Sequence, residues 1–238
     1  MTRRNLDDAL GWAEQGTKLF LGALAELRDD ELDLPSALPV WTRKHLVAHL
    51  AGNGEALLNL VRWAATGEET PMYSSPHQRN ADIEAGAQRP AGVLRVWVEQ
   101  SAARLAEGFA GLDAEQWERP VRTAQGRTVP ASEIPWLRAR EVMVHTVDVD
   151  AEVDFSDLPV DFLLALVDDV MAKRSTSDGP ALTVIADPGE ERWFVTGVGS
   201  PVELRGSIPR VAAYLTGRSA TGVATSDDSA VPVLPPWL

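Results

Sequence analysis

The sequence predicts an α+β protein of two domains, a four-helix bundle followed by a small α/β unit. Four long stretches within the first 150 residues carry apolar side chains at helical spacing. After about residue 155 the pattern changes, and short apolar runs typical of strands lie between two further helical stretches. At 238 residues the chain is long enough for two small domains. We therefore expect a bundle over residues 1–152 and a C-terminal domain over residues 153–238.

The first domain contains the four helices of the expected bundle. They are expected to span residues 5–28, 42–66, 90–109 and 132–149. Thr42 is a suitable N-cap for the second helix, and Gly67 is expected to end it. Pro90 and Pro135 are compatible with helix because we expect each to lie in a first turn. Long amphipathic helices in this number are typical of a four-helix bundle.

Two long connections interrupt the bundle. The segment 67–89 is rich in Pro, Ser and Gly, and we expect a short helix within it at 77–85. The stretch 111–129 is expected to be irregular, with Gly126 allowing a tight turn. Connections of this length in a compact domain are often functional.

The second domain is predicted to mix helices and strands. The expected elements are a helix at 159–174, strands at 181–186, 192–196 and 201–204, and a helix at 208–215. Ser207 can cap the last helix, and Gly217 is expected to end it. The proline-rich tail that follows is expected to be extended.

Composition excludes several kinds of function. The formal charge of −13 disfavours nucleic acid as a partner, because phosphates need clustered Lys and Arg. The chain has no cysteine, which excludes disulfides, thiolate metal sites and cysteine nucleophiles. Any thiol chemistry must therefore use a thiol that arrives as a cofactor.

The sequence suggests neither a signal peptide nor a membrane helix. The N-terminus lacks the apolar core of a signal peptide, and no stretch approaches the roughly 20 apolar residues of a membrane helix. We expect a cytoplasmic protein. The sequence shows no coiled-coil seam and no exposed apolar stripe, so we also expect a monomer.

Potential metal ligands occur in pairs on two of the expected helices. His45 and His49 lie four residues apart in WTRKHLVAHLAGN, and Glu141 and His145 do so in REVMVHTVD, so each pair shares a helical face. Two histidines and one carboxylate with an open position are typical of catalytic zinc, although iron and manganese accept the same ligand types. Spacing alone does not choose between His45 and His49. Taken singly, each histidine is more typical of a hydrogen-bonded core or surface residue than of a metal ligand.

The segments WTRKHLVAHLAGN, GEETPMYSSP and TAQGRTVPASEIPWLRAREVMVHTVD resemble the mycothiol-dependent maleylpyruvate isomerases, as do YLTGR and the terminal PPWL. The resemblance extends over nearly the whole chain and implies a DinB-like four-helix bundle followed by a small α/β domain. It also implies that zinc is held by His49, Glu141 and His145, with His45 outside the coordination sphere. The arginine of the YxxGR segment, used at the active site in that family, matches Arg218.

The resemblance implies an activity as well. The family isomerises maleylpyruvate to fumarylpyruvate in gentisate-type aromatic degradation, with mycothiol as cofactor. A zinc-bound thiolate would add to the substrate double bond, and rotation and expulsion would give the trans isomer. The enolate and the substrate carboxylates need cationic donors, for which Arg218 is the first candidate. Arg79 and Arg127 are candidates for contact with the cofactor.

Three other functions are compatible with the sequence. A mycothiol S-transferase acting on another electrophile would use the same zinc and differ in its pocket. A metal-dependent hydrolase would activate water instead of a thiol. A ligand-binding bundle with a vestigial metal site would not be an enzyme, and it would fail to retain stoichiometric metal.

Overall fold

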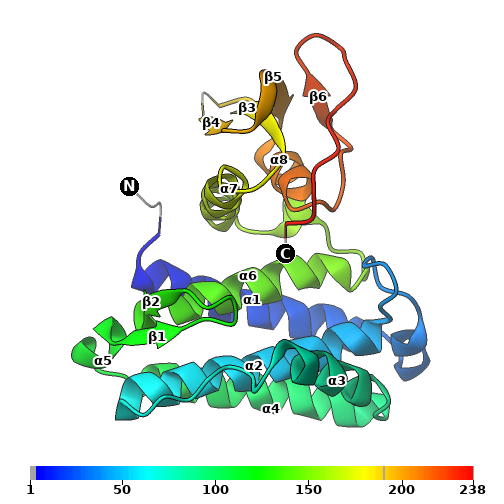
Figure 1. Cartoon of the computed structure of the whole chain (residues 1–238). Helices are drawn as coiled ribbons and strands as arrows, with labels where there is room; N and C mark the ends of the chain where they lie inside the picture. The colour runs from blue at the N-terminus through cyan, green and yellow to red at the C-terminus, as the bar shows by residue number, and fades with distance from the viewer. Residues whose placement is uncertain (1–3, 190, 238) are drawn as a thin grey trace. The chain divides into compact units, whose positions relative to one another are not determined.

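Four long helices lie alongside one another and form the bundle expected from the sequence (Figure 1). They are α1 (Leu6–Glu26), α2 (Arg43–Thr66), α4 (Ala91–Ala110) and α6 (Ile134–Asp148). α1 packs mainly against α6, and α2 packs mainly against α4. The α2–α6 contact is less extensive, and the α1–α4 contact is the least extensive of the four. The bundle is thus two tight helix pairs that meet along looser seams.

This computed structural model describes residues 4–189 and 191–237. The chain divides into two compact units, one of Asn5–Val153 and the other mainly of Asp154–Leu238. Within the described residues, no helix combines the length and the apolar character needed to cross a membrane. The predicted α+β class is confirmed.

The helix ends follow local sequence rules. Asn5 caps α1 by accepting from the Asp8 amide, and the Asp8 carboxylate accepts from the Asn5 amide in return. α2 begins after Thr42 and ends at Gly67, whose φ of 80° is the left-handed conformation that glycine tolerates best. Both expected ends of α2 are therefore confirmed. Pro90 differs from expectation, because it is the N-cap of α4 and not a residue of its first turn.

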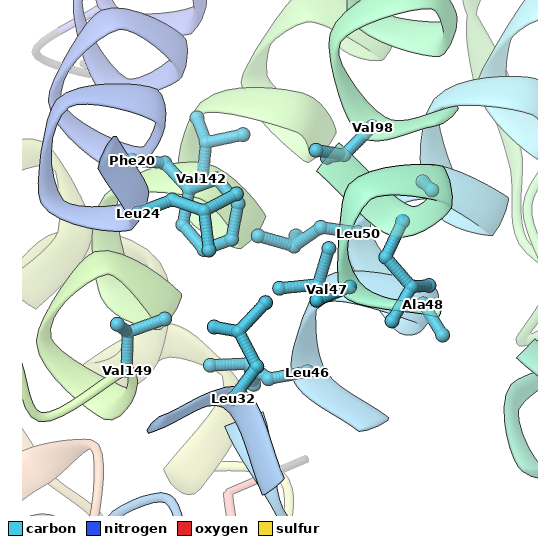
Figure 2. Close-up of a cluster of buried hydrophobic side chains, with 13 residues drawn as sticks. Phe20, Leu24, Leu32, Leu46, Val47, Ala48, Leu50, Val98, Val142 and Val149 are labelled. Carbon is cyan, nitrogen blue, oxygen red and sulfur yellow. The ribbon is translucent and has the colours of Figure 1, made fainter. Parts of the chain in front are cut away.

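The bundle core is filled by hydrophobic side chains from all four helices (Figure 2). One cluster includes Phe20, Leu24, Leu32, Leu46, Val47, Leu50, Val98 and Val142. Leu32 comes from the short helix η1 (Asp29–Asp33), which joins α1 to α2. Each such side chain stabilises the fold by about 1.5–3 kcal/mol when fully buried. This core holds α2 and α6 as rigid supports for polar side chains between them.

The connections contain more structure than expected. The predicted short helix is confirmed as α3 (Pro76–Ala87), which begins after the N-cap Ser75. The expectation of an irregular stretch at 111–129 is wrong. It holds α5 (Ala114–Glu118) and a hairpin of β1 (Pro120–Arg122) and β2 (Thr128–Pro130). Its strands are too short for periodicity to reveal, although Gly126 does form the expected turn with φ of 80°. The 3₁₀ turn η2 (Ala131–Glu133) then leads into α6.

The second unit is a four-stranded sheet with two helices against it. The strands are β3 (Pro180–Ala186), β4 (Arg192–Val195), β5 (Val198–Gly206) and β6 (Val223–Thr225), in the order β4-β3-β5-β6. β3 is parallel to β5, and the other pairs are antiparallel. Three strands were predicted, but β5 is longer than expected and β6 was missed because only three residues form it.

The helices of this unit follow the expected pattern. η3 (Phe155–Asp157) precedes α7 (Val160–Arg174), and α8 (Ile208–Leu215) begins after Ser207. α7 contacts α8 and β4, whereas α8 contacts the other three strands. Arg174 at the end of α7 donates to the Leu215 carbonyl from both Nε and Nη2. This contact ties the ends of α7 and α8 together.

Candidate metal site

Two histidines and one carboxylate converge between α2 and α6. His49 Nε2 lies 2.8 Å from Glu141 Oε2, and His145 Nε2 lies 3.5 Å from the same oxygen. One possible ligand atom from each of the three residues lies within 4.8 Å of the others. His49 is 4% exposed, and the core clusters around α2 and α6 fix the positions from which the three side chains project. His49 lies 92 positions before Glu141 in the chain, and His145 lies 4 positions after Glu141. The structure thus brings together residues from two distant helices.

Asp148 orients the third member of this cluster. Its carboxylate lies 2.8 Å from His145 Nδ1, and Asp148 is fully buried. Both residues lie on α6 three positions apart, which places them on one face of the helix. A carboxylate holding one imidazole nitrogen fixes the ring orientation and leaves the other nitrogen for a metal. Two imidazoles, one carboxylate and this outer support suit a divalent metal with an open coordination position.

Burial and mutual hydrogen bonds shift the pKa values of all three residues. Burial lowers the pKa of His49 despite its hydrogen bond to Glu141. Burial opposes ionisation of Glu141, but hydrogen bonds from His145 and His49 hold its pKa well below the usual range. Burial also acts to lower the pKa of His145, but the hydrogen bonds to Asp148 and Glu141 prevail and raise it to about 8. The cluster therefore holds an ionised carboxylate beside one neutral and one protonated histidine at neutral pH.

Replacing Asp148 by asparagine should lower the pKa of His145 in the metal-free protein. The Asp148 hydrogen bond is the largest influence that raises this pKa, and a neutral amide stabilises the imidazolium less. The raised pKa stabilises the folded wild type below pH 6.5, and this contribution is lost as the pH rises through about 8. The variant should therefore lose less folding stability than the wild type as the pH rises through this range. Proton NMR titration of His145 and urea unfolding at several pH values measure both effects, and an unchanged pKa would contradict the assigned role.

His45 does not join the cluster. Its Nδ1 lies 2.7 Å from Thr42 Oγ1 and accepts from the Thr42 amide at 3.2 Å, which closes a cap at the start of α2. Its Nε2 faces Glu84 at 3.4 Å. The structure therefore places His49, and not His45, in the cluster with Glu141 and His145.

A His45→Ala variant should lose about 1 kcal/mol of stability but keep any bound metal. The loss comes from the missing cap interaction with Thr42, which is worth about that much at a helix start. Urea unfolding and metal analysis after gel filtration are the measurements. Loss of stoichiometric metal with intact fold would place His45 in the coordination sphere.

A cavity of about 410 Å³ opens beside His49, between α2 and the segment leading through α3. Arg79 in α3 and Tyr73 before it line this cavity. Arg79 Nη2 lies 3.3 Å from His49 Nδ1, and the Arg79 guanidinium carbon is 5.9 Å from the centre of the Tyr73 ring. Trp41 packs against His49, with its ring centre 5.5 Å from that of His49. The long connection therefore places the Arg79 guanidinium and the Tyr73 ring beside the site.

The other two arginines singled out in the sequence lie elsewhere. Arg127 is exposed in the turn of the β1–β2 hairpin, and it does not line the cavity beside His49. Arg218 belongs to the second unit, directly after α8. The Gly217 amide donates to the Tyr214 carbonyl and the Arg218 amide donates to the Ala213 carbonyl, with Gly217 at φ 79°. This helix-ending motif fixes the backbone from which the half-buried Arg218 side chain projects.

Two residues of the site were missed by sequence reasoning. Asp148 could have been found, because it lies three residues after His145 on the same predicted helix. Tyr73 could not, because it lies in a loop without periodic pattern. Burial raises the pKa of Tyr73, so its hydroxyl stays protonated and able to donate.

The fold and this cluster define a class of protein: a helical bundle with a His–Glu–His cluster between two helices, joined to a small α/β unit. The sequence-family model described as the mycothiol maleylpyruvate isomerase N-terminal domain matches residues 13–150 of this chain. The chain is also similar to a crystal structure of the mycothiol-dependent maleylpyruvate isomerase, with 38% identity, a TM-score of 0.94 and full coverage of both chains. A histidine-to-alanine mutant of that enzyme matches equally well. No curated protein matches the chain. The chain therefore belongs to the mycothiol-dependent maleylpyruvate isomerase family.

Proposed function

We propose that this chain catalyses the mycothiol-dependent cis–trans isomerisation of maleylpyruvate to fumarylpyruvate. The observation that carries the proposal is the convergence of His49, Glu141 and His145 beside a ligand-sized cavity, in a chain that has no cysteine. Membership of the isomerase family supports the same reaction.

We propose that a zinc ion is held by His49, Glu141 and His145. The donor set suits zinc, since two imidazoles and one carboxylate leave a coordination position open. When bound, zinc would supply a Lewis acid that lowers the pKa of the mycothiol thiol and so provides the nucleophile that the chain itself lacks.

The surrounding residues prepare the site for that chemistry. Asp148 holds the His145 ring in one orientation, and the ionised Glu141 contributes a negative charge that favours a cation at the cluster. Trp41 covers one side of His49 and helps to exclude water. A site that is buried in this way strengthens the electrostatic interactions made within it.

Arg79 is proposed to contact the ligands in the cavity. In the present arrangement it donates to Nδ1 of neutral His49, whose Nε2 proton then points to Glu141. A metal at Nε2 would leave the ring proton on Nδ1, which could then no longer accept from Arg79. Metal loading should therefore free the guanidinium to bind oxygen atoms of the cofactor or substrate.

An Arg79→Leu variant is expected to bind zinc normally but to raise KM by about 10- to 100-fold. The reason is the loss of a charge-assisted hydrogen bond worth about 1.5–3 kcal/mol. Steady-state kinetics in mycothiol and in maleylpyruvate would show which ligand is held. Arg62→Leu is the matched control, because Arg62 is exposed on α2 and lines none of the described cavities. Unchanged KM values for both ligands would remove Arg79 from the binding site.

Arg218 is proposed to contact the reacting substrate. The substrate carries two carboxylates and develops an enolate, and arginine stabilises such groups through a planar pair of donors. The match of Arg218 to the YxxGR segment of the family supports this role. The helix-ending motif supports it further, because a fixed backbone limits the entropy lost on binding.

The reaction is tested by following maleylpyruvate absorbance on zinc-loaded protein, with and without mycothiol. Turnover that requires the thiol is the expected result. Equal activity without thiol would support activation of water instead. No turnover, with metal bound at one per chain, would contradict the substrate assignment and favour mycothiol transfer to another electrophile.

A further inference from the structure

A second cavity, of about 540 Å³, lies along the seam between α1 and α4. It shares no lining residue with the cavity beside His49. Most of its walls are apolar, with Leu10 and Ala13 from α1, Leu105 and Phe109 from α4, and Trp117 from α5. The solvent-exposed side chains of Glu14, Lys18 and Glu99 also line it, so their charges are screened by water, unlike a charge in the interior. Its volume falls within the range of about 300–1,000 Å³ that is typical of small-molecule sites.

The cavity exists because small residues face the seam. Ala102, Ala103, Ala106 and Ala110 of α4 line it, and their methyl groups are too short to reach α1. This explains why the α1–α4 contact is the least extensive of the four helix contacts around the bundle. Such a gap leaves apolar surface uncovered.

A buried cation lines the same cavity. Arg138 of α6 is only 2% exposed. Its described hydrogen bonds both come from Nη1, to the Leu50 carbonyl at 2.9 Å and to Asn53 Oδ1 at 2.8 Å. Its Nε has no hydrogen-bond partner among the described residues. A buried charged side chain with an unpaired hydrogen-bond donor is energetically costly unless an anion or another acceptor pairs with it.

The protein itself supplies little compensation for this charge. Both described hydrogen-bond partners of Arg138 are neutral oxygen atoms. Glu141 acts on Arg138 electrostatically, but its carboxylate is already engaged with His49 and His145. Because burial outweighs these influences, the pKa of Arg138 is lowered to about 10. The guanidinium nonetheless remains charged at neutral pH.

We propose that the α1–α4 cavity binds a small monocarboxylate with an apolar chain or ring. The apolar part would lie against Leu10, Leu105 and Phe109, and the carboxylate would point toward Arg138. Charge complementarity selects this occupant, because an uncharged or cationic apolar molecule would leave the guanidinium uncompensated. An apolar helix from a second copy would leave it uncompensated for the same reason. This inference does not depend on the proposed isomerase activity.

The test is isothermal titration calorimetry of the full chain with octanoate and with octylammonium, which has the same chain length and opposite charge. Octanoate is expected to bind at one site per chain, and octylammonium at least about tenfold more weakly. Arg138 also supports the core through α2, so the charge is tested with this pair of ligands and not by substitution.

The location is tested by filling the cavity. Ala106→Phe adds a ring at an exposed wall position of α4 and should weaken octanoate binding by about tenfold or more. Gln100→Phe is the matched control, because Gln100 is exposed on the same helix but does not line the cavity. Absence of octanoate binding, equal binding of the two ligands, or equal affinity of the two variants would each overturn the proposal. A dimer that dissociates in Ala106→Phe would overturn it in favour of a second copy.

Discussion

A His49→Ala variant is expected to lose its zinc and more than about 100-fold in kcat/KM. Substitution of a group that merely supports a metal ligand costs about 10- to 100-fold, and removal of a ligand should cost more. The variant also removes the 2.8 Å contact between His49 and the half-buried Glu141 carboxylate, and it leaves the 3.5 Å contact with His145. Both effects follow from the position of His49 between Glu141 and the cavity.

Mass spectrometry measures the zinc that stays bound, and the maleylpyruvate assay measures kcat/KM. His77→Ala is the matched control, because His77 lies in α3 and is exposed. The control should retain metal and activity. A His49→Ala protein that keeps one zinc per chain would contradict the proposed ligand set.

An Arg218→Ala variant is expected to keep its zinc but to lose about 10²- to 10³-fold in kcat. This is the usual cost of removing one donor that stabilises developing negative charge. The metal should remain because His49, Glu141 and His145 all belong to the other unit. Loss of turnover with retained metal would separate the role of Arg218 from that of the ligands.

Arg210→Ala provides the control for this variant. Arg210 lies on α8, eight positions before Arg218 in the chain, and its guanidinium faces Asp154 at 3.7 Å on an exposed surface. Exposed ion pairs of this kind contribute about 0–1 kcal/mol, so neither stability nor kcat should change much. Full activity of Arg218→Ala would remove Arg218 from the mechanism.

Long periodic helices could be predicted from the sequence, and the three-residue strands could not. α2 shows why, since Thr42 and Gly67 mark its ends and its apolar positions repeat over 24 residues. The β1–β2 hairpin and β6 consist of three-residue strands, which contain at most one full alternation. Their pairing is fixed by tertiary contacts, as for Val121, which packs in the core with Leu57 and Leu60.

The site was predictable only where the chemistry follows helical spacing. Glu141 and His145 share a face of α6 by their four-residue separation, and the structure brings both beside His49. The identical spacing of His45 and His49 carried no such information, because His45 is used to cap α2. Arg138 was not singled out at all, since its burial depends on how α6 packs against α2.

The central claim is that His49, Glu141 and His145 hold a zinc ion with a position open to the mycothiol thiol. X-ray absorption at the zinc edge tests it most directly. Without mycothiol, the spectrum should show only nitrogen and oxygen ligands at about 2.0–2.2 Å. After mycothiol is added, a sulfur ligand should appear at about 2.3 Å, and it should be absent from the His49→Ala protein. An unchanged shell of nitrogen and oxygen ligands in the presence of saturating mycothiol would contradict the claim.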